Sequence, residues 1–208
     1  MGDKAKVYIV DDDQDMRQSM QWLLESVNLP VYVYESAEQF LSGFNENRPG
    51  CLLLDVHMPG MGGLRLLEYL HTSHPYLPVV IFTGYGDVEM AVSALKVGAF
   101  DFIEKTATPQ LILERVQHAM EVGKSLHVQA IERARCKQLL DQLSQREHEI
   151  LLKMIQGQSS KSIAIELGLS ERTVEKHRKN VMDKTQARSV AELVRLFYVQ
   201  VEDKEIKT

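Results

Sequence analysis

The chain has 208 residues, which is enough for one large domain or two small ones. Its composition of 44% hydrophobic and 25% charged residues is typical of a soluble globular protein. No apolar run is long enough to span a bilayer and no signal-peptide core follows the N-terminus, so we expect a cytoplasmic protein without a membrane partner. Cys51 and Cys136 lack partners at metal-ligand spacing, which indicates reduced thiols.

The net charge of −5 conceals an uneven distribution along the chain. Residues 1–120 contain 16 acidic and 8 basic residues, a net charge of −8, whereas residues 121–208 contain 13 and 16, a net charge of +3. An acidic half and a basic half suggest different partners, with nucleic acid as a candidate for the basic half.

The first half of the chain alternates short β-like runs with helical patterns. Apolar runs at 6–10, 31–34, 51–54, 79–82 and 100–103 predict five strands, with helical stretches between them. Ser36 and Asp87 are suited to cap two of these helices, and Gly98 is suited to end one. The repeats predict an α/β domain with a doubly wound, five-stranded parallel sheet of the flavodoxin-like type.

A long helix is predicted after Thr108 and Pro109, which suit a helix cap and a first helical turn. From there to about Leu143 the chain has no further proline and only one glycine, Gly123, and its apolar residues keep helical spacing. We therefore expect residues 1–122 to form the first domain and residues 123–142 to continue its last helix as a linker. The alternative is two helices with a break near Gly123.

The second domain, over residues 143–208, is predicted to be all-α with four helices. Ser144 and Glu147 form a capping-box pattern at the start of the first helix. Gly168 makes a tight turn, and Ser170 caps a third helix that runs to about Lys184. A helix, a glycine turn and a capped helix are the signature of a helix-turn-helix DNA-binding motif.

Acidic and other polar side chains follow the ends of four predicted strands of the first domain. Asp11 and Asp12 come after the first strand, Asp55 after the third, and Thr83 and Lys105 at the ends of the fourth and fifth. In a doubly wound sheet these strand ends line one crevice. Clustered carboxylates repel one another unless a cation neutralises them, and their hard oxygens suit Mg²⁺. The set predicts a phosphoryl-transfer site, and the chain has no P-loop motif to hold ATP.

Four motifs resemble those of the CheY-like receiver domains of bacterial response regulators, over roughly residues 5–122. They are VDD at 10–12, DVHMPG at 55–60, TG at 83–84 and FIEK at 102–105. The resemblance implies that Asp55 accepts a phosphoryl group from a sensor histidine kinase. It also implies a Mg²⁺ cofactor bound by Asp12, Asp55 and the main-chain carbonyl of His57.

The same resemblance assigns roles to the other residues at the site. Asp11 acts on the metal through a bound water, and Lys105 pairs with the phosphoryl oxygens. Thr83 turns its hydroxyl onto the phosphate, and Phe102 moves inward as an aromatic switch; an ordinary core role for Phe102 is the alternative. Asp13 is expected to be a helix cap and not a metal ligand.

One residue departs from the receiver pattern. The family usually has proline after the lysine, often with a cis peptide bond, whereas Lys105 is followed by Thr106. A cis bond before a residue other than proline costs about 2.5–4 kcal/mol. The Lys105–Thr106 bond is therefore either trans, or cis and strained, and the aim of Lys105 depends on which.

Three stretches of the second domain resemble the LuxR-type helix-turn-helix domain. They are LSQRE at 143–147, KSIA at 161–164 and LSERTVEKHRKNV at 169–181. With the receiver, they are similar to the FixJ/NarL class of regulators, and in part to the StyR and TodT regulators of aromatic-hydrocarbon catabolism. The resemblance implies six DNA-binding residues: Lys161, Thr173, Glu175, Lys176, Arg178 and Lys179.

We therefore expect a two-component response regulator and not an enzyme. Phosphorylation of Asp55 would switch binding to promoter DNA, with an aromatic-catabolism operon as one candidate target. RNA polymerase and a second copy of the chain, joined as a homodimer on phosphorylation, are the other expected partners. A DNA-binding protein with an inactive receiver is the main rival. The unphosphorylated receiver would either mask the DNA-binding surface or sit apart from it on a rigid linker.

Overall fold

The computed structural model describes residues 5–46, 48–84 and 88–205, with side chains as far as Val199. The chain divides into two compact units, Met1–Gln129 and Ala130–Thr208, which are described separately. The division falls inside the predicted linker. Asp87, the expected cap of a helix, lies outside the described residues.

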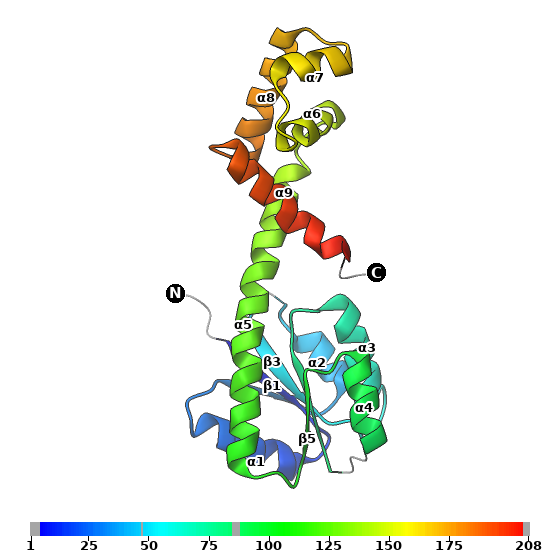
Figure 1. Cartoon of the computed structure of the whole chain (residues 1–208). Helices are drawn as coiled ribbons and strands as arrows, with labels where there is room; N and C mark the ends of the chain where they lie inside the picture. The colour runs from blue at the N-terminus through cyan, green and yellow to red at the C-terminus, as the bar shows by residue number, and fades with distance from the viewer. Residues whose placement is uncertain (1–4, 47, 85–87, 206–208) are drawn as a thin grey trace. The chain divides into compact units, whose positions relative to one another are not determined.

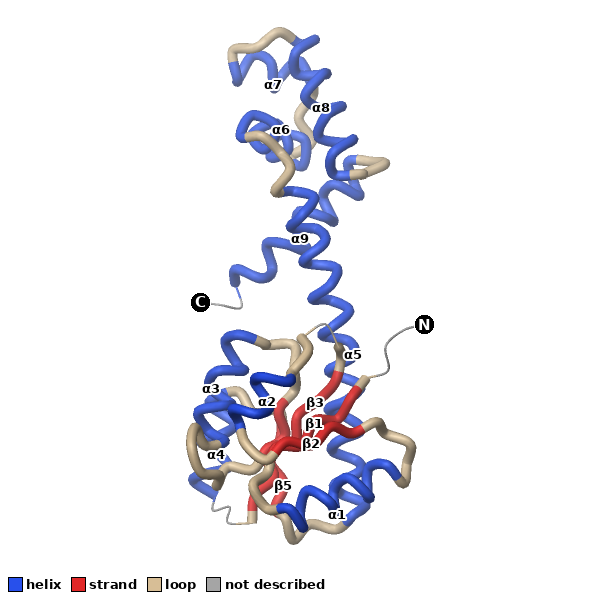
Figure 2. The backbone as a smooth tube through the Cα atoms, turned by 180° about the vertical axis from the view of Figure 1, so that it is seen from behind, coloured by secondary structure: helices blue, strands red, loops and turns tan. Residues whose placement is uncertain are grey.

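The N-terminal unit is built on a five-stranded parallel sheet in the order β2-β1-β3-β4-β5, which confirms the predicted fold (Figure 1; Figure 2). Its elements are β1 (Lys6–Val10), α1 (Gln14–Glu25), β2 (Val31–Tyr34), α2 (Ala37–Gly43), β3 (Gly50–Leu54), α3 (Gly63–Ser73), β4 (Val79–Thr83), α4 (Val88–Val97) and β5 (Asp101–Glu104). Helices α2, α3 and α4 cover one face of the sheet, and α1 and α5 (Pro109–Leu140) cover the other (Figure 1).

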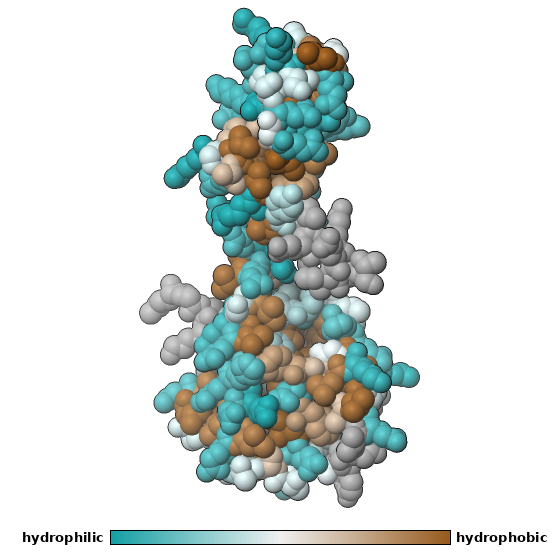
Figure 3. Space-filling model, in the orientation of Figure 1, coloured by the Kyte–Doolittle hydropathy of each residue, from teal (hydrophilic) through white to brown (hydrophobic). Residues whose placement is uncertain are grey.

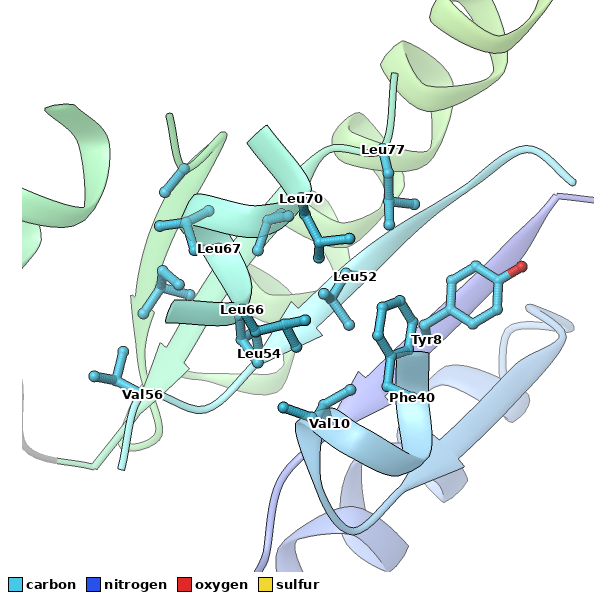
Figure 4. Packing of buried hydrophobic residues seen from close by; sticks show 14 of the residues in the cluster. Tyr8, Val10, Phe40, Leu52, Leu54, Val56, Leu66, Leu67, Leu70 and Leu77 are labelled. Atoms are coloured by element: carbon cyan, nitrogen blue, oxygen red, sulfur yellow. The ribbon is translucent and has the colours of Figure 1, made fainter. Parts of the chain in front are cut away.

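Side chains of the central strands alternate between two hydrophobic cores. Leu52 and Leu54 of β3 face α2 and α3, where they meet Phe40 and Leu66 (Figure 4). Cys51 and Leu53 of β3 belong to the core on the opposite face. Because both faces are covered, every residue of β3 and β4 is buried, which explains their continuous apolar runs in the sequence.

Helix α5 (Pro109–Leu140) is a single helix of 32 residues, without a break at Gly123. A Cβ atom at Gly123 would lie only 2.0 Å from the main-chain oxygen of Gly50 and 3.2 Å from Pro78. The missing side chain therefore lets α5 pack directly against the start of β3, and the glycine serves packing instead of ending the helix. The continuous helix supports the proposed linker, whose boundaries at residues 122 and 142 remain a proposal.

The C-terminal unit contains the end of α5 and four helices: α6 (Gln145–Ile155), α7 (Ser160–Leu167), α8 (Glu171–Thr185) and α9 (Val190–Glu205). Ile150, Ile163, Val174 and Leu193, one from each helix, are fully buried in a common core. Gly168 ends α7 in the left-handed conformation with φ of 65°, and Ser170 caps α8 through the Thr173 N–H. The pair α7–α8 has the helix-turn-helix arrangement. No helix in the described part of the chain is both long and apolar enough to cross a membrane.

A buried carboxylate joins the first and third helices of this unit. Glu147 completes the capping box with Ser144 and accepts a hydrogen bond from Lys184 Nζ at 2.6 Å. Its side chain is 4% exposed, against 40% for Lys184. The hydrogen bond from Lys184 and the one from the Ser144 N–H lower the pKa of Glu147 from 4.5 to about 2.

We predict that Lys184→Ala lowers the free energy of unfolding by about 1–2 kcal/mol at pH 7, because it leaves a buried carboxylate with fewer donors. The folded pKa of Glu147 lies below its ordinary value, so its stabilising contribution is present above about pH 4.5 and is lost as the pH falls towards 2. The difference in the free energy of unfolding between Lys184→Ala and the wild type should therefore shrink in acid. Urea unfolding followed by circular dichroism between pH 7 and 3.5 measures it, with Lys137→Ala on the exposed face of α5 as the control.

Candidate functional site

The structure brings the three predicted acidic residues together at the carboxyl ends of β1 and β3. Val10 pairs with Leu54 in the sheet, and the Asp55 N–H donates to the Val10 carbonyl at 2.9 Å, so Asp11 and Asp55 follow side by side. Both are buried, with exposures of 1% and 5%, whereas Asp12 is exposed. Ligand oxygens of the three carboxylates lie within 4.8 Å of one another.

Lys105 reaches the same cluster from the end of β5. Its main-chain N–H donates to the Thr83 carbonyl at 2.9 Å, which continues the pairing of β4 with β5. Its Nζ lies 2.7 Å from Asp11 Oδ2 and 2.8 Å from Asp55 Oδ2. One ammonium thus bridges two buried carboxylates.

The charges at the cluster do not balance. Burial raises the pKa of Asp11, although the hydrogen bond from Lys105 opposes this shift. Burial also disfavours the charged form of Lys105, but hydrogen bonds to Asp11 and Asp55 outweigh it and raise the pKa of the ammonium. Lys105 is therefore charged at neutral pH, and three carboxylates face one ammonium. Excess negative charge on hard oxygen donors is the setting that suits a divalent cation such as Mg²⁺.

Thr83 supplies a buried hydroxyl on the same rim. The residue is fully buried, and its Oγ1 has no hydrogen-bond partner among the described residues. Buried hydroxyls are nearly always hydrogen-bonded, so an orphan at the end of a central strand points to a partner supplied from outside the chain.

The remaining predicted residues of this site occupy three different environments. The His57 side chain is exposed, while its main-chain N–H donates to Asp55 Oδ1 at 3.2 Å. Phe102 is half-buried and packs against the core beneath α3 and α4. Asp13 accepts hydrogen bonds from the N–H groups of Asp15 and Met16 as the cap of α1.

The Lys105–Thr106 peptide bond is trans, because the described residues include no cis peptide bond. Lys105 nevertheless reaches both carboxylates. Thr106 turns away and donates its hydroxyl to Glu104 Oε2 at 3.2 Å. The departure from the usual proline therefore does not move the ammonium out of the site.

Arg17 of α1 also contacts the site, and the sequence analysis missed it. Its Nη1 donates to the main-chain carbonyl of Asp11 at 2.6 Å and thereby fixes the loop that carries Asp11 and Asp12. Arg17 lies one turn after the cap Asp13, a position from which a long side chain can fold back over the start of the helix. That spacing was the available signal.

In the C-terminal unit, the predicted DNA-binding residues lie on α7 and α8. Glu175, Lys176 and Lys179 of α8 and Lys161 of α7 are exposed. Arg178 is half-buried and donates to the Gln158 carbonyl at 3.1 Å, and the Thr173 hydroxyl shares a 2.7 Å hydrogen bond with Ser170 at the helix cap. Hydrophilic side chains dominate the visible surface where α7 and α8 lie (Figure 3).

Both halves of the chain match known protein families. Residues 7–117 match the response regulator receiver domain, and residues 141–197 match the LuxR family of bacterial regulatory proteins. The transcriptional regulatory protein TdiR of Thauera aromatica is 39% identical over 193 residues, 93% of this chain and 85% of TdiR. FixJ of Azorhizobium caulinodans is 39% identical over 196 residues, 94% of this chain and 93% of FixJ.

A solved, low-resolution structure of the response regulator StyR is similar over both units, with a TM-score of 0.80 and 36% identity. The match covers 94% of this chain and 98% of the StyR chain. Receiver domain and DNA-binding domain together define a response regulator that acts on transcription. The chain belongs to the FixJ/NarL family of these regulators.

Proposed function

We propose that Asp55 is the phosphoacceptor of this response regulator and that its phosphorylation switches promoter binding by α8. The observation that carries the proposal is the convergence at Asp55 of two further carboxylates, a bridging ammonium and an orphaned hydroxyl. The substrate is the phosphoryl group of a phosphorylated sensor histidine kinase. The chain acts as a regulated transcription factor in the cytoplasm, where its promoter DNA lies, and not as an enzyme with turnover.

In the proposed reaction, a carboxylate oxygen of Asp55 attacks phosphorus, and the bond from phosphorus to the donor breaks. The product is an acyl phosphate on Asp55, and the electron pair of the broken bond leaves with the donor. Lys105 already lies at Asp55 Oδ2 and would neutralise charge on the transferred group. The Thr83 hydroxyl would donate to a phosphoryl oxygen and so gain the partner that it lacks, and Phe102 would follow it inward.

The residues present fit a bound Mg²⁺ ion. Asp12, Asp55 and the His57 carbonyl would hold it directly, and Asp11 would act through water. When bound, the ion supplies positive charge that offsets the repulsion between the carboxylates and the incoming phosphoryl group. The hydrogen bond from Arg17 to the Asp11 carbonyl keeps the acidic loop in place for that role.

For DNA, we propose that α8 enters the major groove. Glu175, Lys176 and Lys179 would face bases or phosphates, because they lie on the exposed side of α8, opposite the buried Val174 and Val181. Thr173 and Arg178 would contact phosphates, and Lys161 would approach the DNA backbone from α7.

Phosphorylation would favour a homodimer on paired half-sites, which then recruits RNA polymerase. The resemblance to the StyR and TodT regulators makes an aromatic-catabolism operon the first target to examine.

Binding experiments test the coupling between the two units. A duplex enriched from a random-sequence library on the phosphorylated chain should bind the chain more tightly after treatment with acetyl phosphate and Mg²⁺ than before. Gel shift and analytical ultracentrifugation would follow affinity and dimer formation. Equal affinity before and after a verified mass gain would refute the switch, and the absence of any mass gain would favour an inactive receiver.

A further inference from the structure

The loop between β3 and α3 begins at Asp55 and donates a main-chain hydrogen bond to its carboxylate. Asp55 Oδ1 accepts a hydrogen bond from the His57 N–H, and the Val56 carbonyl accepts one from the Gly63 N–H, both at 3.2 Å. At its far end, a Cβ atom at Gly63 would lie 2.0 Å from the Asp55 carbonyl oxygen, so the loop closes tightly on itself. These contacts fix the base of the loop to Asp55.

The tip of the loop is fixed by a different element, helix α2. Glu38 Oε1 accepts a hydrogen bond from the Met61 N–H at 2.9 Å. A Cβ atom at Gly60 would lie 2.8 Å from the same oxygen, and Gly60 itself has a φ of 78°. The main chain of the tip therefore runs directly against this carboxylate, along a path that only glycine follows without strain.

The Glu38 carboxylate is itself held in place within α2. Hydrogen bonds from its own main-chain N–H, from the Met61 N–H and from the Ser36 hydroxyl hold the pKa of Glu38 below its ordinary value. Glu38 is exposed, so its carboxylate is not needed to fill a core. Glu38 belongs to the first turn of α2 and its carboxylate accepts a hydrogen bond from the loop, so it links the two.

We propose that Glu38 is a positioning residue of the phosphoacceptor site. Through Met61 it holds the loop in the conformation that aims Asp55 and the His57 carbonyl at the cation. The inference rests on the proposed function of Asp55. Glu38 touches neither the cation nor the phosphoryl group, and acts through the loop main chain.

Three substitutions separate the hydrogen bond from the charge. Glu38→Gln keeps an oxygen at the same reach and removes the charge, whereas Glu38→Asp keeps the charge and shortens the reach by one methylene group. Glu38→Ala removes both the charge and the hydrogen-bond acceptor. Glu68→Ala removes an exposed carboxylate from α3, away from the loop, and serves as the matched control.

The readouts are Mg²⁺ affinity by calorimetry on the full chain, the rate of phosphorylation by acetyl phosphate, and the exchange rate of the Met61 amide without Mg²⁺. We expect Glu38→Ala and Glu38→Asp to weaken Mg²⁺ binding and slow phosphorylation about fivefold, the effect of one ordinary hydrogen bond. Their Met61 amides should exchange faster. Glu38→Gln and Glu68→Ala should stay within about twofold of wild type.

Wild-type values for Glu38→Ala, or a defect in Glu38→Gln equal to that of Glu38→Ala, would overturn the inference. If Glu38→Ala fails to fold, Glu38→Asp takes its place. Wild-type values for Glu38→Asp, or a defect in Glu38→Gln equal to that of Glu38→Asp, would then overturn the inference. Failure of the wild type to bind Mg²⁺ or to gain mass would instead reject the proposed function of Asp55, so the two failures are distinguishable.

Discussion

Asp55→Asn is expected to abolish the mass gain that the wild-type chain shows with acetyl phosphate and Mg²⁺. The amide has no carboxylate oxygen with which to form an acyl phosphate, so the loss should be complete and not partial. The variant should keep its fold, because asparagine has nearly the same shape and Lys105 retains its ion pair with Asp11. Intact-protein mass spectrometry measures the outcome.

Asp101→Asn is the control for this experiment. Asp101 lies in the same sheet, at the start of β5 and away from the acidic cluster, and pairs with Arg115. The Asp101→Asn variant should gain mass with acetyl phosphate and Mg²⁺ as the wild type does. A mass gain in Asp55→Asn equal to that of the wild type would mean that the phosphoryl group is accepted elsewhere.

Lys179→Ala should weaken DNA binding and make it less dependent on salt. Lys179 is exposed on the charged side of the helix, and loss of one phosphate contact makes the negative slope of log affinity against log salt shallower by about 0.9. We expect affinity for a random-sequence duplex to fall about threefold to tenfold at moderate salt. Fluorescence anisotropy over a salt series measures both quantities.

Lys137→Ala, which removes an exposed lysine from α5, controls for the general loss of positive charge. It should change neither affinity nor slope appreciably. If Lys179→Ala matched the wild type in both affinity and salt slope, α8 would not be the helix that approaches the phosphates.

The fold was largely predictable because its signals are local. Continuous apolar runs marked the buried strands, and serine and aspartate caps marked the helix starts at Asp13, Ser36, Ser144 and Ser170. Gly123 was ambiguous for a physical reason. Its role depends on the distant Gly50 carbonyl, and a single sequence shows the glycine but not what it packs against.

The cluster around Asp55 was predictable because a parallel sheet brings strand ends together. Arg17 and Glu38 were missed because their partners are main-chain groups, the Asp11 carbonyl and the Met61 N–H, which residue identity does not reveal; for Arg17 only its spacing after the cap Asp13 gave a signal. The isomer of the Lys105–Thr106 bond was also open, since it depends on the folded loop and not on the two residue types alone.

The contact between Gly123 and Gly50 has a practical consequence for dissecting the protein. A receiver fragment cut at residue 122 would end before this contact and would also lack His127, which is 8% exposed and lies edge-on to the Tyr76 ring. Such a fragment would leave the start of β3 open to solvent. A cut after Gln129, where the compact unit ends, keeps both contacts and is the better junction for isolating the receiver or for fusing another output domain to it.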